Sequence, residues 1–264
     1  KTLKKHLRSK LVLKAFFKSI LVFFSTLFIL ALMSVGLVGC SHSKSWKTAD
    51  RSSAKIAPLP SEAPEAIVQI YTARAFSWRG YFGVHPWVSV KPKDAEQYTV
   101  YQVLGWNVRR GLSAVSIKKD IPDRIWFDKK PTLIFELRGK KAEEAIPKIA
   151  KAVKSYSYNN QYGVYPGPNS NTFVAHIIRS VPELTVELPP TAIGKDRLNN
   201  DQFFAWSESG TGVQASLYGL LGLTVGAAEG IEVNIIGMNF GIDFLSPALK
   251  LPFVGRLGFK DQPL

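Results

Sequence analysis

Four segments of the chain alternate apolar and polar residues or carry short β-branched runs, which predicts β-strands. These strands are expected at residues 66–72, 82–90, 97–104 and 132–137. The second one places valines on one side and His85 and Trp87 on the other. Pro86 removes a backbone donor from this strand, so we expect an edge position or a bulge near His85.

Apolar residues three and four positions apart predict amphipathic helices over 141–156 and 171–181. The basic stretch 106–130 shows no apolar period, and we expect a loop there that is either solvated or rests on anionic headgroups. Between Gly210 and Gly258 frequent glycines separate short β-rich runs, which predicts short strands joined by tight turns. The fold class is therefore α+β: a small antiparallel sheet with two packed helices and a glycine-rich β extension.

An uncharged apolar run from Ile20 to Val38 follows seven basic residues, which is the pattern of an export signal. The run ends in Leu-Val-Gly-Cys40, which resembles the lipobox of bacterial lipoproteins, where the cysteine becomes the acylated N-terminus. The alternative is an uncleaved N-terminal membrane helix, because about 20 apolar residues also span a bilayer. Either anchor places the remaining chain in the bacterial cell envelope, facing the periplasm or the exterior. Which membrane holds it is not predicted.

The rest of the chain divides into a tether over 41–65 and one globular domain over 66–264. The tether is rich in Ser, Lys, Ala and Pro and shows no apolar period. Half of the net charge of +14 lies in residues 1–40, and the other half is interspersed with 20 acidic residues. An exported chain with such mixed charge is not expected to bind nucleic acid.

The globular domain offers few ligands for a metal. Cys40 is the only cysteine of the chain, and the domain holds only His85 and His176. Structural zinc sites need four Cys or His ligands, so we expect no metal site, and no sequence motif indicates another cofactor.

Two residues have the chemistry of a catalytic pair. Ser170 directly precedes the helix predicted at 171–181, and a helix N-terminus offers a favourable dipole and unpaired N–H groups for an oxyanion. A strand histidine such as His85 can act as its general base. We therefore expect a hydrolase or acyl transferase that acts on an ester or amide. Alternatively, Ser170 only caps the helix and His85 is a buried strand residue.

The order of these residues resembles the circularly permuted papain-like folds related to the NlpC/P60 hydrolases, whose motif is Asn-Cys-Asn-x-Phe. Here the motif reads Asn169-Ser170-Asn171-Thr172-Phe173, with a hydroxyl that ionises far less readily than a thiol. The resemblance implies a third polar group that orients His85, for which Gln102 is the candidate. It also implies a groove, which a non-catalytic protein would keep to bind a cell-wall fragment, a lipid fragment or a protein. Candidate binding residues are Asn169, Asn171, Trp87, Tyr165, Arg74 and Arg79.

Four further motifs show a second resemblance. They are Ala-Arg-Ala-Phe-Ser-Trp-Arg-Gly at 73–80, Gly-Val-His-Pro-Trp at 83–87, Gly-Pro-Asn-Ser-Asn-Thr-Phe at 167–173 and Leu-Pro-Pro-Thr-Ala-Ile-Gly-Lys-Asp at 188–196. Together they resemble an uncharacterised bacterial family, domain of unknown function 3750, over most of residues 66–260. This resemblance supports a single domain and implies no activity, so the substrate, the partner and the oligomeric state are not predicted.

Overall fold

The computed structural model describes residues 14, 18, 19, 22 and 45–261 and divides the chain into two units, Lys1–Cys40 and Ser41–Leu264. Cys40 and most of the predicted export signal lie outside the described residues, and the four described positions before residue 45 are helical. Among the described residues, no helix combines the length and the apolar character needed to cross a membrane.

The first layer of the second unit is a five-stranded antiparallel sheet with the spatial order β4-β3-β2-β1-β5. Its strands are β1 (Ile67–Arg74), β2 (Val84–Lys91), β3 (Thr99–Val103), β4 (Val115–Lys119) and β5 (Thr132–Arg138). The predicted α+β class with an antiparallel sheet is confirmed. Strand β4 lies in the stretch that was expected to be a loop, because its lysines and the exposed Ile117 hide the strand pattern.

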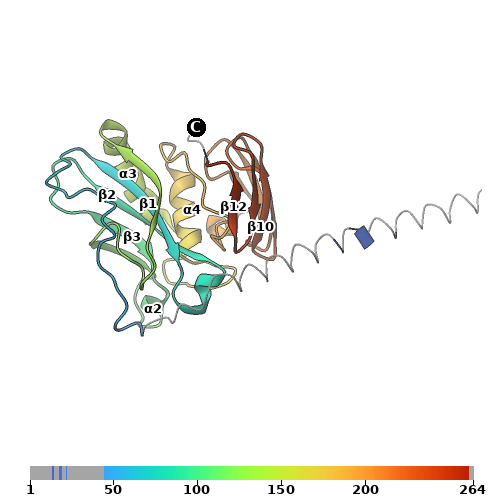
Figure 1. The fold of residues 1–264 in the computed structure, drawn as a ribbon, viewed down its shortest axis with the longest axis horizontal. Helices are drawn as coiled ribbons and strands as arrows, with labels where there is room; N and C mark the ends of the chain where they lie inside the picture. The colour runs from blue at the N-terminus through green and yellow to red at the C-terminus, as the bar shows by residue number, and fades with distance from the viewer. Residues whose placement is uncertain (1–13, 15–17, 20–21, 23–44, 262–264) are drawn as a thin grey trace, which may run out of the picture. The chain divides into compact units, whose positions relative to one another are not determined.

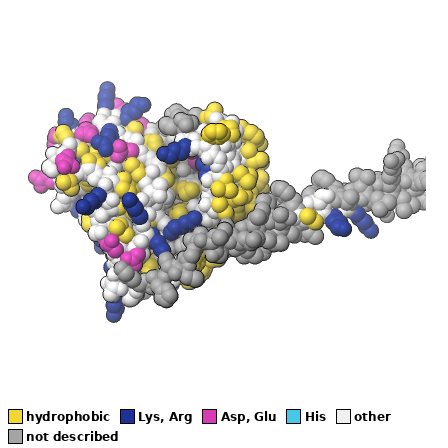
Figure 2. All heavy atoms as spheres, in the orientation of Figure 1, with side chains coloured by type: hydrophobic (Ala, Val, Ile, Leu, Met, Phe, Trp, Pro, Cys, Tyr) yellow, Lys and Arg dark blue, Asp and Glu magenta, His cyan; other side chains and the backbone are white. Residues whose placement is uncertain are grey.

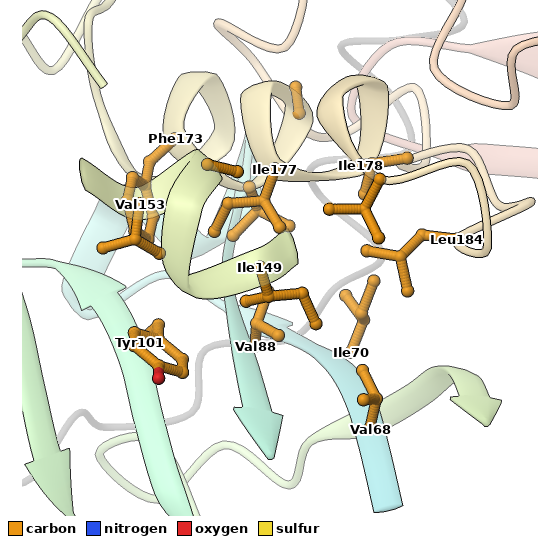
Figure 3. Packing of buried hydrophobic residues seen from close by; sticks show 14 of the residues in the cluster. Val68, Ile70, Val88, Tyr101, Ile149, Val153, Phe173, Ile177, Ile178 and Leu184 are labelled. Atoms are coloured by element: carbon orange, nitrogen blue, oxygen red, sulfur yellow. The ribbon is translucent and has the colours of Figure 1, made fainter. Parts of the chain in front are cut away.

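Two helices, α3 (Lys140–Ser155) and α4 (Ser170–Ser180), cover one face of this sheet (Figure 1). Ile149 of α3 and Ile177 of α4 point toward Val68 and Val88 of the sheet, and all four side chains are fully buried (Figure 3). Both helices were predicted from their apolar periodicity. The connections add three short helical elements: η1 (Ser77–Tyr81), α2 (Gly105–Val108) and η2 (Asn199–Asp201).

Pro86 lies in an interior strand, which corrects the expected edge position. Strand β2 pairs with β1 along its whole length, and Pro86 stands opposite Thr72. The pairing of β2 with β3 covers only Val88 to Val90. The half of β2 that contains Pro86 therefore has a neighbouring strand on one side only, as an edge strand does.

The segment expected to be a flexible tether is packed against the domain over its described residues 45–65. The carboxylate of Asp123 accepts hydrogen bonds from the backbone N–H groups of Ile56 (2.6 Å) and Ala57 (3.1 Å). It also accepts one from the hydroxyl of Ser53 at 2.8 Å. Further hydrogen bonds join Arg124 to the carbonyl of Arg51 at 3.2 Å and Tyr98 to the carbonyl of Pro58 at 3.0 Å, so contacts with the domain order a segment whose own composition is typical of a coil.

A seven-stranded antiparallel sheet, ordered β12-β11-β10-β9-β8-β7-β6, forms the C-terminal part. Its strands are β6 (Phe204–Trp206), β7 (Gly212–Leu217), β8 (Leu221–Gly226), β9 (Gly230–Ile235), β10 (Met238–Asp243), β11 (Ala248–Leu251) and β12 (Gly255–Gly258). The predicted short strands are confirmed. Helix α4 lies between the two sheets (Figure 1), and Arg179 near its end donates to Gln214 of β7 at 2.5 Å.

The inner face of this second sheet is polar. The carboxylate of Asp196 accepts hydrogen bonds from the amides of Gln214 (2.7 Å), Asn234 (2.8 Å) and Asn239 (2.7 Å). Buried ion pairs on the same face join Lys195 to Glu232 at 2.8 Å, Lys250 to Glu187 at 2.5 Å and Lys250 to Glu232 at 3.0 Å. The two sheets are therefore connected through a hydrogen-bonded polar layer rather than through a second apolar core.

Candidate functional site

A pocket of about 590 Å³ lies where β2, the start of α4 and two turns of the second sheet meet. Most of its lining is aromatic or aliphatic. Besides the indole groups of its tryptophans, the polar residues of the described lining are Arg79, His85, Arg109, Tyr162, Tyr165, Asn169, Ser170 and Asn171, and none of the lining is acidic. The pocket thus offers an apolar volume with two cationic groups and a cluster of uncharged hydrogen-bonding groups.

Asn169 caps helix α4, so the hydroxyl of Ser170 is not used for capping. The Oδ1 atom of Asn169 accepts hydrogen bonds from the N–H groups of Asn171 (2.9 Å) and Thr172 (3.3 Å), while Thr172 Oγ1 accepts one from the N–H of Asn169. The cap is therefore Asn169, and the alternative in which Ser170 caps the helix is wrong. Among the described residues, neither the N–H nor the hydroxyl of Ser170 has a protein partner, although the residue is 4% exposed.

The loop 188–196 holds this helix start from the other side. The side-chain amides of Asn169 and Asn171 both donate to the carbonyl of Ile193, at 3.0 and 2.8 Å. Gly194 has a φ of +98°, and a Cβ on it would lie 2.7 Å from Asn169 Nδ2, so only glycine fits this close approach. Two motifs that are far apart in the sequence therefore form one structural unit. Asn171 Oδ1 is buried there without a hydrogen-bond partner among the described residues.

His85 lies on β2 and is held between two groups. Its Nε2 is 3.1 Å from Oε1 of Gln102 on β3, and its ring stacks on Trp126 at 3.9 Å with an interplanar angle of 10°. An amide oxygen only accepts hydrogen bonds, so Nε2 carries the proton and Nδ1 keeps its lone pair. Burial lowers the pKa of His85 to about 4, and the ring is neutral at pH 7. Gln102 thus lies where an orienting group for His85 is needed.

Two of the predicted binding residues do not line the pocket. Trp87 is 2% exposed, donates its indole N–H to the carbonyl of Pro122 at 2.7 Å and stacks on Tyr71. Arg74 donates to the carbonyl of Phe253 at 3.1 Å, and burial lowers its pKa. Both residues hold the walls of the pocket in place. Their side chains are therefore positioned to support the site and do not reach its ligand.

Several lining residues were not predicted. Trp126 was expected in a loop at the surface, but it is 8% exposed and forms the wall against which His85 stacks. Arg109 comes from the stretch 106–130 and Tyr162 from the loop that precedes α4. Phe253 comes from a turn of the second sheet. The aromatic residues of 106–130 are the sequence feature that could have indicated a buried pocket wall in this basic stretch. No sequence signal places Phe253 beside a strand about 170 positions earlier.

Taken together, the two sheets and the pocket define an α+β domain with a candidate Ser–His site at a helix N-terminus. The chain belongs to the DUF3750 family, described as a protein of unknown function, whose sequence profile matches residues 65–197. This range contains His85, Ser170 and the supporting loop. No curated protein and no solved structure matches the chain, and the permuted papain-like arrangement stays a prediction.

Proposed function

We propose that this protein is a bacterial envelope lipoprotein, acylated at Cys40, whose domain is a hydrolase or acyl transferase for an ester or amide. Ser170 is the nucleophile and His85 is the general base. One observation carries the proposal: the unpaired hydroxyl and N–H of Ser170 lie in the same pocket as a neutral histidine that Gln102 orients. The permuted papain-like kinship would account for this order of residues in the chain.

The proposed reaction begins when Ser170 Oγ attacks the carbonyl carbon and Nδ1 of His85 takes the hydroxyl proton. The N–H of Ser170, at the positive end of the α4 dipole, donates to the oxyanion that forms. Collapse of this intermediate breaks the bond to the leaving group, which receives the proton from His85. Water or another acceptor then attacks the acyl carbon and gives its proton to Nδ1 of His85. The acyl group leaves Ser170, and Oγ of Ser170 takes the proton back from His85. The low pKa of His85 weakens it as a base and strengthens its protonated form as an acid.

The lining of the pocket indicates the class of substrate. Arg79 and Arg109 provide positive charge without any acidic neighbour in the described lining, while Phe76, Trp106 and Met238 provide apolar surface. An anionic amphiphile, such as a fragment of an acylated lipid, matches both features. A cell-wall fragment with an apolar substituent would match them in the same way.

A fluorophosphonate probe tests the nucleophile, because it reacts covalently with activated serines. We expect labelling of the wild type, none of Ser170→Ala, and normal labelling of Ser180→Ala, a matched control at the exposed end of the same helix. Ser170→Cys should react with iodoacetamide faster than the wild type, whose only cysteine is Cys40. Equal fluorophosphonate labelling of the wild type and Ser170→Ala would overturn the proposed catalysis.

A non-catalytic binding protein is the second candidate, and the low pKa of His85 together with serine in place of cysteine favours it. In this case dodecyl phosphate should quench tryptophan fluorescence, since Trp78, Trp106 and Trp126 line the pocket. Arg109→Gln should weaken this binding, while the exposed Lys151→Gln should not. If His85→Gln still binds dodecyl phosphate and the wild type is not labelled by the fluorophosphonate, the binding protein is favoured over the enzyme. Quenching that Arg109→Gln does not change would exclude it.

A further inference from the structure

The second sheet exposes an unbroken apolar surface. One row of directly paired residues crosses six strands from β7 to β12: Val213, Val225, Ile231, Ile242, Leu249 and Leu257. Each of these side chains is between 42% and 58% exposed. We call this side of strands β6–β12 the apolar outer face. Figure 2 shows hydrophobic side chains gathered over these C-terminal strands, whereas charged side chains lie mainly over the other part of the domain.

The polar inner face explains why the apolar side points outward. Alternate residues of each strand face opposite sides of a sheet. The inward positions hold Gln214, Glu232, Asn234 and Lys250, all of them buried in the polar layer around Lys195. Turning the sheet over would break these ion pairs, so the fold keeps the apolar outer face exposed.

The chemistry of this face fits hydrocarbon better than a protein partner. Protein interfaces form about one hydrogen bond per 100–200 Å² of buried area. Among the outward positions of these described strands, Trp206 carries the only polar side-chain group, an indole N–H. The backbone N–H and C=O groups of β7–β11 pair with strands on both sides, and among the described strands only the outer edges of β6 and β12 have no neighbouring strand. Contact with acyl chains would therefore leave almost no polar group unsatisfied.

No exposed charge opposes such a contact. The ionisable acids and amines between Gln202 and Phe259 are Glu208, Glu229, Glu232, Asp243 and Lys250, and all five are buried. The remaining charged group, Arg256, is half-buried and pairs with Asp243 at 2.7 Å. The side chains at the edges include Phe204 and Trp206, aromatic types that are enriched where a membrane meets water.

The chain length before the domain brings a bilayer within reach. Ala49 is the first buried residue of the second unit that the structure describes. The nine peptide units from Cys40 to Ala49 span at most roughly 30 Å when fully extended. If Cys40 is acylated, as the proposed function states, Ala49 cannot lie further than this from the lipid surface.

We propose that the apolar outer face docks on the acyl-chain boundary of the bilayer to which Cys40 anchors the protein; the proposal rests on the proposed anchorage. Met238 pairs with Ile235 on this face and also lines the pocket. Docking therefore places the part of the pocket lined by Met238 beside the lipid, where an acylated lipid is the nearest source of an ester for Ser170.

The test uses the full chain in vesicles of phosphatidylethanolamine and phosphatidylglycerol, with an environment-sensitive dye on a single new cysteine. Leu223→Cys lies at the centre of the apolar outer face, Val233→Cys pairs directly beside it, and Lys151→Cys on α3 is the exposed control. Acylated Cys40 has no free thiol, so the wild type serves as the blank. We expect lipids with brominated acyl chains to quench the dye at 223 and 233 and to leave the dye at 151 unchanged.

Equal accessibility of positions 223 and 151 to aqueous iodide in vesicles would overturn the proposal. Protection of position 223 from iodide without quenching by brominated lipid would also overturn it and would indicate a second copy on this face. The mass of the peptide that contains Cys40 reports acylation separately. An unacylated Cys40 refutes the proposed anchorage; the dye is then attached in the Cys40→Ser background, where the quenching pattern at 223, 233 and 151 still decides whether the face contacts lipid.

Discussion

The buried His85 should make the protein less stable in mild acid. Its pKa falls from the ordinary 6.5 to about 4 because the ring is buried. Between these two values the unfolded chain binds a proton on this histidine and the folded chain does not. The free energy of unfolding should therefore decrease as the pH falls from about 6.5 to about 4 and should lose no more through this group below pH 4.

The size of this effect follows from the same two pKa values. One pKa unit corresponds to about 1.4 kcal/mol, so the full effect is about 3 kcal/mol. At about pH 4.5 most of it, roughly 2–3 kcal/mol, should already be lost. This is a large fraction of the about 5–15 kcal/mol that stabilises a typical domain.

The measurement is urea unfolding of the wild type and of His85→Gln at about pH 7.5 and about pH 4.5. The other titrating groups are common to both proteins, so the difference between them gives the contribution of His85 to the free energy of unfolding. The wild type should lose about 2–3 kcal/mol more than the variant on acidification. His176→Gln measures how much the other histidine of the domain contributes to the loss of stability on acidification, because burial also lowers the pKa of His176. Equal losses in wild type and His85→Gln, or an NMR titration of the ring that gives a pKa near 6.5, would refute the reasoning.

Two further substitutions test the polar layer and the helix start. Lys250→Met should cost about 3–5 kcal/mol in urea unfolding because it removes the nearest cation of the buried Glu187 carboxylate and leaves only Arg256 at 4.0 Å, whereas the exposed Lys260→Met should stay within about 0.5 kcal/mol. Equal effects of the two would contradict the buried ion pair. Gly194→Ala should cost about 1–3 kcal/mol, through its positive φ and the clash with Asn169, and should slow fluorophosphonate labelling. An unchanged melting temperature would show that the loop tolerates a Cβ.

The sequence predicts the elements of the first layer because their periodicities are strong, and it predicts less well where a distant residue decides the structure. The segment before Ala66 has the composition of a coil, and contacts with distant residues such as Asp123 and Tyr98 order part of it. In the second sheet the alternation is visible, for example Val213 beside Gln214. The usual rule that the apolar side faces inward gives the wrong orientation there, because the partner of this sheet is the charged pair Lys195–Asp196.

In the candidate site, too, the sequence predicts some residues and not those that long-range packing brings in. The order and residue types of Ser170, His85 and Gln102 indicate a site from the sequence. The structure places Ser170 and His85 in one pocket and Gln102 within hydrogen-bond distance of His85. Trp126 and Phe253 were missed because they reach the pocket through long-range packing. The position of Trp87 near His85 predicts a binding residue, but alternate residues of a strand need not share one environment. The indole N–H of Trp87 donates to the carbonyl of Pro122 instead.

The polar layer has a consequence for how the molecule can be divided. The family profile ends at Arg197, two residues after Lys195, while the hydrogen-bonded side-chain partners of Lys195 and Asp196 lie on β7, β9 and β10. A fragment cut at the end of the family match would keep an ammonium and a carboxylate without the groups that compensate them. The two sheets should therefore unfold as one cooperative unit, with a single transition shared by all probes, and the boundary of the family profile is not a boundary of the folding domain.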